Sequence, residues 1–309
     1  MQLYKHIPLV NALSPATGFG LPFIGNPLLN QSGLHLWRIR AADAALKMRQ
    51  HQITEKSPIA ATLADQGVAV VENFLSDENF AALQNEVRQA LGDSERKIPA
   101  KNSDTKRFGN KQHFEGGFDR YDGDTLNRFL DISATATPLT HGFLQNEDLQ
   151  RVCNQSTGTR FNTAKFQIYL TRQTEIEKAR DPQLHMHRDT FFSCLKLWYF
   201  TEDVTLDDGP FKYCPGSHRM TPCRLEWEHA QSIHAARTNS GGSFRISESD
   251  LASLDCSEAK TFPVSANTLI LADVRGFHAR GPAQKAGAQR LSIYGNIRPW
   301  PFVPIAYSC

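Results

Sequence analysis

Four segments rich in β-branched and aromatic residues constrain the fold of this chain more than any other feature. They are residues 166–171 (FQIYLT), 194–200 (CLKLWYF), 268–272 (TLILA) and 290–295 (RLSIYG). Segments of this length and composition predict β-strands. All four lie in the second half of the chain, which is therefore predicted to supply a sheet-based core.

The first half carries mostly helical patterns. A helix is expected from about Ser32, and a second is expected to end at Gly67, directly before a short apolar strand at residues 68–71. Ser76 can cap a third helix, which is expected to end at Gly92.

Shorter helices are expected between residues 125 and 155 and near 221–237 and 247–254. Helices followed by strands predict an α+β, mainly β, fold with the helices packed outside a β-barrel or sandwich. We expect one domain, with an arm and helix at residues 1–60 packed on a core of residues 61–309.

Composition excludes several classes of protein. The 309 residues are 40% hydrophobic and 21% charged, as in ordinary globular proteins, and Lys plus Arg exceed Asp plus Glu by only 34 to 32. This balance gives no global field that would attract nucleic acid or an anionic membrane. No apolar run approaches the ~18 residues of a membrane span. The six cysteines include no C-x-x-C pair, so the expected location is the cytoplasm.

A metal site is suggested by His187 and Asp189. Residues two apart on an extended segment project from the same face, so this imidazole and carboxylate lie side by side. His278 is the expected third ligand, with His185 as a rival. Two histidines and one carboxylate leave three positions of an octahedral ion open, the pattern of non-haem Fe(II) oxygenases.

Arg290 and Ser292 are predicted to share one face of the last strand. A planar guanidinium beside a hydroxyl is a good receptor for the distal carboxylate of a dicarboxylate. Arg280 is a second candidate for this anchor.

Two further strand faces are candidates for the wall of the site, although an ordinary structural role is the simpler explanation of both. One face carries Lys196, Trp198 and Phe200. Lys196 can bind a dicarboxylate co-substrate there, but pairing with an aspartate or simple exposure is the more common role of such a lysine. The other face carries Gln167, Tyr169 and Thr171.

On these motifs the chain resembles the phytanoyl-CoA dioxygenase family of Fe(II)- and 2-oxoglutarate-dependent oxygenases. Four stretches carry the resemblance, in the family's order: residues 65–76 (DQGVAVVENFLS), residues 187–189 (HRD), residues 207–218 (DDGPFKYCPGSH), and His278 followed by Arg290. The resemblance implies a double-stranded β-helix core (a jelly-roll, cupin-like) with flanking N-terminal helices.

The resemblance also implies roles for the candidate residues. His187, Asp189 and His278 would be the catalytic iron ligands, and Arg290, with Ser292 beside it, would bind 2-oxoglutarate. The implied reaction uses Fe(II), 2-oxoglutarate and O₂ to hydroxylate an unactivated C–H bond of a small-molecule metabolite, with release of succinate and CO₂. Hydroxylation is expected rather than halogenation, because halogenating relatives replace the carboxylate at the Asp189 position with a small residue.

The alternative is a non-catalytic jelly-roll protein that binds a metal for binding or sensing. It predicts a further protein ligand that closes the coordination sphere. The oligomeric state is left open by the sequence.

A basic segment points to an anionic substrate. Residues 93–118 are polar and turn-rich, and a loop there could cover the barrel mouth as a lid; a solvated loop is the simpler interpretation. Its basic residues are Lys97, Lys101, Lys106, Arg107 and Lys111.

Overall fold

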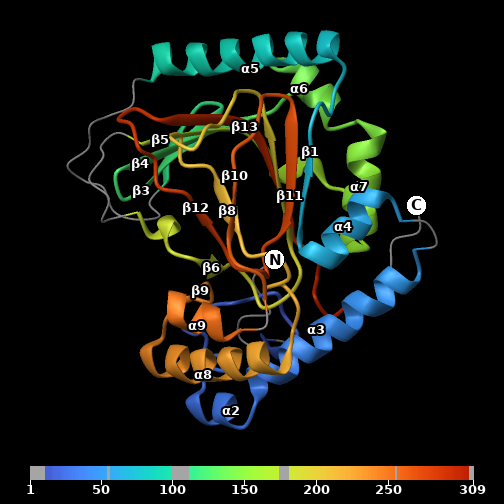
Figure 1. Ribbon diagram of the computed structural model, residues 1–309, viewed down its shortest axis with the longest axis vertical. Coiled ribbons are helices and arrows are strands. Elements are labelled where there is room, and N and C mark those ends of the chain that lie inside the picture. Colours follow the sequence, from blue (N-terminus) through green and yellow to red (C-terminus); the bar gives the residue numbers. More distant parts are fainter. Residues whose placement is uncertain (1–10, 54–55, 99–110, 174–180, 255, 306–309) are drawn as a thin grey trace.

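The computed structural model describes residues 11–53, 56–98, 111–173, 181–254 and 256–305. Within them, two antiparallel sheets form the centre of the molecule (Figure 1). The larger has the strand order β1-β11-β7-β13-β5-β4-β3-β2, and the smaller β10-β8-β12-β6-β9.

The strands of the larger sheet are β1 (Val68–Val71), β2 (Lys111–Phe114), β3 (Gly117–Asp122), β4 (Thr125–Asp131), β5 (Phe166–Gln173), β7 (Leu195–Phe200), β11 (Thr268–Asp273) and β13 (Gln289–Ile297). Those of the smaller sheet are β6 (His187–Arg188), β8 (Phe211–Tyr213), β9 (Phe244–Arg245), β10 (Lys260–Phe262) and β12 (His278–Arg280). The helices are α2 (Pro27–Gln31), α3 (Leu34–His51), α4 (Pro58–Gln66), α5 (Asp77–Lys97), α6 (Pro138–Phe143), α7 (Glu147–Thr157), α8 (Pro222–Thr238) and α9 (Glu248–Ser253).

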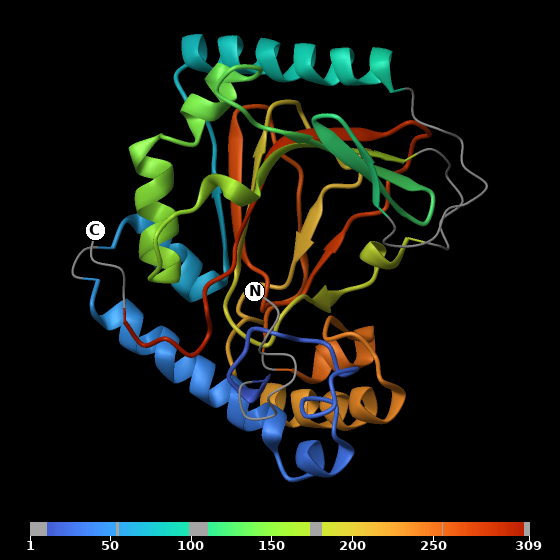
Figure 2. The same ribbon diagram turned by 180° about the vertical axis from the view of Figure 1, so that it is seen from behind.

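The central strands of the larger sheet are covered on both faces. Phe200 and Ile270 on its inner face pack with Phe211 of the smaller sheet. Its outer face packs against helices, where Val87 of α5 and Leu149 of α7 belong to one apolar cluster with the strands. Figures 1 and 2 show α5 across one end of the sheets and α6 and α7 along one side. A strand covered on both sides is rich in apolar residues, and β11 is buried along its whole length with an apolar centre at residues 269–272.

The predicted class is confirmed at the level of a mixed fold built on large antiparallel sheets. The four expected strands form β5, β7, β11 and β13, and the short apolar strand is β1. The expected helical insertions form α8 and α9, whose N-caps Thr221 and Ser247 accept hydrogen bonds from the backbone N–H three residues on.

The predicted end of α5 at Gly92 is wrong, because this helix continues to Lys97. The last residues of the helix, 95–97 (ERK), are good helix formers, and Arg128 of β4 binds this end of the helix. Its Nη1 donates to Ser94 Oγ at 3.3 Å and its Nη2 to the Ile98 carbonyl at 2.9 Å. These hydrogen bonds satisfy groups that a helix end leaves unpaired.

The interpretation of residues 93–118 as one loop is also wrong over its described part. Lys97 ends α5, and Lys111 begins β2. Lys101, Lys106 and Arg107 lie outside the described residues. The helices expected between 125 and 155 begin only at α6, because residues 125–131 form β4, joined to β3 by a turn at Gly123.

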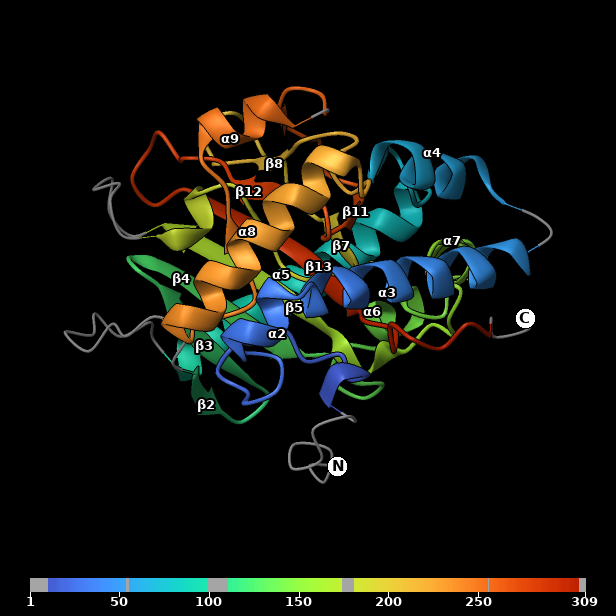
Figure 3. The ribbon, with the colours of Figure 1, turned by 90° about the horizontal axis from the view of Figure 1, so that it is seen from below.

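The N-terminal helices pack on the end of the molecule formed by α8. Figure 3 shows α2, α3 and α8 together across this end. A buried carboxylate, Glu228, joins them to the predicted metal motif: it accepts hydrogen bonds from Arg188 at 2.8 and 2.6 Å, from Arg224 at 3.0 Å and from His35 Nε2 at 3.0 Å. Burial lowers the pKa of His35 to about 4, so its ring is neutral at neutral pH.

Glu228→Gln is expected to lower the free energy of unfolding by about 3–5 kcal/mol, since it leaves the buried Arg188 and Arg224 guanidinium groups without their counter-charge. Chemical denaturation measures this loss. Glu226→Gln is the matched control, because Glu226 lies two residues away on the same helix with an exposed side chain. Equal stability of the two variants would contradict a structural role for the Glu228 network.

Among the described residues, no helix combines the length and the hydropathy that crossing a membrane requires.

Candidate functional site

His187, Asp189 and His278 come together between the two sheets. His187 is the partner of His278 in the pairing of β6 with β12, and Asp189 follows β6 directly. Asp189 Oδ1 lies 3.6 Å from His187 Nε2, and Asp189 Oδ2 lies 3.6 Å from His278 Nε2. The ligand atoms of the three residues all lie within 4.8 Å of one another.

Both imidazoles are oriented by the backbone. Nδ1 of His187 donates to the carbonyl of His185 at 2.7 Å, and Nδ1 of His278 donates to that of Gly276 at 3.0 Å. Each Nε2 therefore keeps a free lone pair, the arrangement found in histidines that bind metals. Burial, and then the neighbouring His278, lower the pKa of His187 to about 3, so that ring is neutral at neutral pH.

The carboxylate of Asp189 completes a donor set that fits a divalent transition metal. Its Oδ2 is buried and lies 3.6 Å from His278 Nε2. Burial alone would raise the pKa of Asp189, but Lys196 and the two imidazoles outweigh burial and hold this pKa well below its usual range. The Asp189 main-chain N–H donates to the Val274 carbonyl at 2.9 Å, which holds the segment against the turn before His278.

Lys196 of β7 approaches this centre most closely among the neighbouring cations. Its Nζ lies 2.5 Å from Asp189 Oδ2, so of the roles expected for Lys196 the structure shows pairing with an aspartate. Burial would lower the pKa of Lys196, but the Asp189 carboxylate outweighs this and raises it.

The rival ligand His185 is not part of the cluster. Its side chain is exposed, and its contribution to the site is the backbone carbonyl that orients His187.

Arg290 and Ser292 face the same cavity as the metal cluster. Among the described residues, the half-buried Arg290 guanidinium has no hydrogen-bond or ion-pair partner. Burial, and then the neighbouring Arg280, lower the pKa of Arg290 to about 10, so Arg290 remains charged at neutral pH. A buried cation without a counter-ion is well suited to bind a carboxylate.

Arg280, the second candidate for the anchor, is already paired. Its guanidinium forms an ion pair with Asp181, donates to Asn127 Oδ1 at 2.9 Å, and lies 3.8 Å from Asp122 Oδ2. The geometry therefore favours Arg290 as the free carboxylate receptor.

The cavity that contains these groups has a volume of about 610 Å³. Both strand faces named from the sequence line it. One is the face of β7 with Lys196, Trp198 and Phe200, and the other is the face of β5 with Gln167, Tyr169 and Thr171.

Sequence reasoning missed another wall of this cavity. Lys111 of β2, Phe118 and Arg120 of β3, and Phe129 of β4 also line it. One signal was present, since Asp122-Gly123 is a typical hairpin turn.

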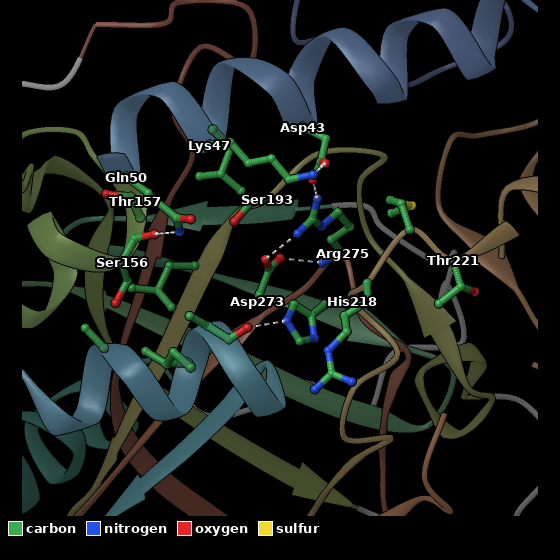
Figure 4. A pocket seen from close by; sticks show the side chains of 17 residues that line it. Asp43, Lys47, Gln50, Ser156, Thr157, Ser193, His218, Thr221, Asp273 and Arg275 are labelled. Atoms are coloured by element: carbon green, nitrogen blue, oxygen red, sulfur yellow. Dashed lines mark hydrogen bonds and ion pairs between the residues drawn. The ribbon is translucent and has the colours of Figure 1, made fainter. Parts of the chain in front are cut away.

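A second cavity, of about 380 Å³, lies between α3, α4 and α7 (Figure 4). It is lined by none of the three candidate ligands. Arg275 crosses it, 2.9 Å from Asp43 of α3 and 3.6 Å from Asp273. These ion pairs tie the N-terminal helix to the turn that leads into His278.

Comparison with known proteins gives a family and several similar folds. No curated protein matches the chain. Solved structures that resemble it include the epimerase SnoN in complex with Fe3+, alpha ketoglutarate and nogalamycin RO (15% identity, 78% of this chain and 85% of that one, TM-score 0.44). EctD from S. alaskensis with 2-oxoglutarate and 5-hydroxyectoine shares 15% identity over 82% and 86% of the two chains, with a TM-score of 0.47. HygX from Streptomyces hygroscopicus with nickel, 2-oxoglutarate and hygromycin B shares 11% identity over 79% and 88%, with a TM-score of 0.45.

The family model for phytanoyl-CoA dioxygenase matches residues 63–284, a stretch that contains His187, Asp189 and His278. This match covers well over half of the chain and confirms the resemblance seen in the sequence. The chain belongs to the phytanoyl-CoA dioxygenase family.

Proposed function

We propose that this protein is a cytoplasmic Fe(II)- and 2-oxoglutarate-dependent dioxygenase that hydroxylates an unactivated C–H bond of a small-molecule metabolite. The observation that carries the proposal is the convergence of His187, Asp189 and His278 beside an unpaired Arg290 in one cavity. Family membership supports it. The arrangement of the sheets supports a jelly-roll core formed by residues 61–309, with the N-terminal arm packed on it.

In this proposal the chain supplies binding and orientation. His187, Asp189 and His278 would hold the metal from one side and leave its other side to the cavity. Arg290 and Ser292 would bind the distal carboxylate of 2-oxoglutarate, and Lys196 would hold the second oxygen of Asp189. When bound, Fe(II) supplies activation of O₂, so that 2-oxoglutarate, O₂ and a C–H bond become succinate, CO₂ and an alcohol.

The structure also favours this proposal over a non-catalytic metal-binding protein. That alternative predicts a fourth protein ligand, with His185 as the candidate. His185 points to solvent instead, and the metal-binding group found among the described residues has three members.

A succinate-release screen tests the proposed function. Purified protein loaded with Fe(II) is incubated with 2-oxoglutarate, O₂ and a panel of small metabolites. We expect at least one metabolite to stimulate succinate release, and its product to gain one oxygen atom that derives from labelled O₂. Asp189→Ala is the control and should release no succinate. A chlorinated product in the presence of chloride, or a product without the labelled oxygen, would refute hydroxylation.

A further inference from the structure

The cavity beside the proposed metal centre is larger than a five-carbon co-substrate requires. Its volume is about 610 Å³, within the range of sites that hold a complete small molecule. Arg290 and Ser292 on β13 mark one side of this space. The opposite side is formed by β2, β3 and β4, which the proposed mechanism does not use.

A row of polar side chains crosses this sheet from β13 to β2. The strand register places Arg290 opposite Thr171, Thr171 opposite Asn127, Asn127 opposite Arg120, and Arg120 opposite Lys111. Residues directly opposite one another share a face of the sheet. The inner face therefore carries a basic residue on β13 and two more at its far edge.

Lys111 and Arg120 form a like-charged pair that the protein neutralises only in part. Arg120 Nη2 lies 2.9 Å from Asp122 Oδ2, but its Nε is buried without a hydrogen-bond partner. Lys111 has no acidic partner among the described residues, and its Nζ lies 4.1 Å from the ring centroid of Phe118. Like charges directly opposite each other in a sheet are unfavourable, so a bound anion would relieve this arrangement.

An apolar stripe runs beside the polar row. The rings of Phe118 and Phe129 stack at 4.7 Å, and those of Phe129 and Tyr169 at 4.5 Å. All three of these aromatic residues line the cavity. The surface that they form extends from Ser292, the strand partner of Tyr169, to Phe118 on β3, next to the edge strand β2.

The charged residues of the cavity wall are mostly basic. Six basic residues line it, against a single acidic one, Asp189, which faces Lys196. Arg280 is paired with Asp181, and Arg290 is assigned to the co-substrate. Lys111 and Lys165, which ends the short 3-10 helix η2 (Thr163–Lys165), have no acidic partner among the described residues. Together with Arg120, which Asp122 neutralises only in part, they remain for a second anion.

We infer that the surface formed by Lys111, Phe118, Arg120, Phe129 and Tyr169 binds the primary substrate, an organic anion with an apolar body whose carboxylate or phosphate lies between Lys111 and Arg120. This inference rests on the proposed function, because it places the reacting C–H bond at the metal centre. From β13 to β3 is three strand spacings, ~14 Å along the sheet, so the substrate is an elongated molecule.

A matched series of probes tests this substrate class. The full-length protein, loaded with Fe(II) under argon, is first saturated with N-oxalylglycine, an unreactive analogue of 2-oxoglutarate, to occupy the metal and Arg290. Calorimetry then measures the binding of 4-phenylbutyrate, its neutral amide, butyrate and 3-phenylpropyl phosphate. The two phenyl acids are 4-phenylbutyrate and 3-phenylpropyl phosphate. We expect at least one of them to bind at least about tenfold more tightly than the amide does, because a hydrogen bond to a charged group is strong. Butyrate, which lacks the apolar body, should bind about tenfold or more weaker than 4-phenylbutyrate.

Variants locate the binding surface. Lys111→Gln and Arg120→Gln should each weaken the binding of the acid at least about threefold and leave the amide unchanged. Lys260→Gln, an exposed lysine on β10 of the other sheet, should change neither. Higher ionic strength should weaken the binding of the acid and leave the binding of the neutral amide unchanged.

Equal affinities for the acids and the amide, or wild-type affinity for the acids in both the Lys111 and the Arg120 variant, would overturn the inference. The N-oxalylglycine titration separates this failure from failure of the proposed function. If the analogue binds only when iron is present, the proposed function stands, whatever the phenyl series shows.

Discussion

The His278→Ala variant is expected to bind Fe(II) at least ~100-fold more weakly than the wild type and to release no measurable succinate. Loss of a group that only supports a metal ligand already costs about 10–100-fold in metal affinity, so loss of a ligand should cost at least as much. The fold should survive, because the His278 ring faces a cavity and not the apolar core. Iron content after gel filtration and thermal unfolding of the metal-free protein measure these two effects.

His185→Ala is the matched control for this variant. The exposed His185 side chain makes no contact with the cluster, and the backbone carbonyl that orients His187 is retained in alanine. We expect wild-type iron content in His185→Ala. Wild-type iron content in His278→Ala would remove His278 from the ligand set, and loss of iron in His185→Ala would make His185 a ligand.

Arg290→Gln is expected to raise the dissociation constant of 2-oxoglutarate about 30-fold or more. Truncation of one partner of a buried, hydrogen-bonded charge pair costs about 2–5 kcal/mol, and each 1.4 kcal/mol corresponds to about a factor of ten. Metal affinity should remain that of the wild type, since Arg290 is not one of the three residues of the metal cluster. Titration of the Fe(II)-loaded protein with 2-oxoglutarate under argon gives both the affinity and the stoichiometry.

Arg290→Lys separates charge from geometry at this position. Lysine keeps the positive charge but loses the planar fork that binds a carboxylate through two parallel hydrogen bonds. An affinity between those of the wild type and Arg290→Gln is therefore expected. If Arg280→Gln weakened 2-oxoglutarate binding more than Arg290→Gln did, Arg280 would be the anchor, despite its ion pair with Asp181.

The local part of the candidate site could be predicted from the sequence. The spacing of His187 and Asp189 determines that both side chains share a face of an extended segment. The same rule placed Arg290 beside Ser292, and both now line the cavity with the metal cluster. These predictions need only the geometry of one strand.

The meeting of His278 with His187 could not be derived from spacing, because it depends on the antiparallel pairing of β12 with β6. In the sequence, only the resemblance to a family pointed to it. Similarly, the preference for Arg290 over Arg280 depends on Asp181, which is distant in the sequence and occupies the Arg280 guanidinium.

The misprediction of β2, β3 and β4 has a physical reason. The β2–β4 strands were interpreted as loop and helix because their polar residues face a cavity, which hides the apolar pattern of a strand. The role of the N-terminal helices had no sequence signal. The buried contact of His35 with Glu228 joins residues far apart in the chain, and tertiary structure alone reveals it.

The release of labelled CO₂ from 1-labelled 2-oxoglutarate tests the central claim most directly. Fe(II)-loaded wild-type protein is predicted to release it in an O₂-dependent reaction, with one succinate per CO₂, while His278→Ala loaded in the same way releases none. Two results would contradict the account: CO₂ release by the wild type without iron or O₂, and CO₂ release by His278→Ala at the wild-type rate. Failure of the metal-loaded wild-type protein to bind 2-oxoglutarate would contradict it as well.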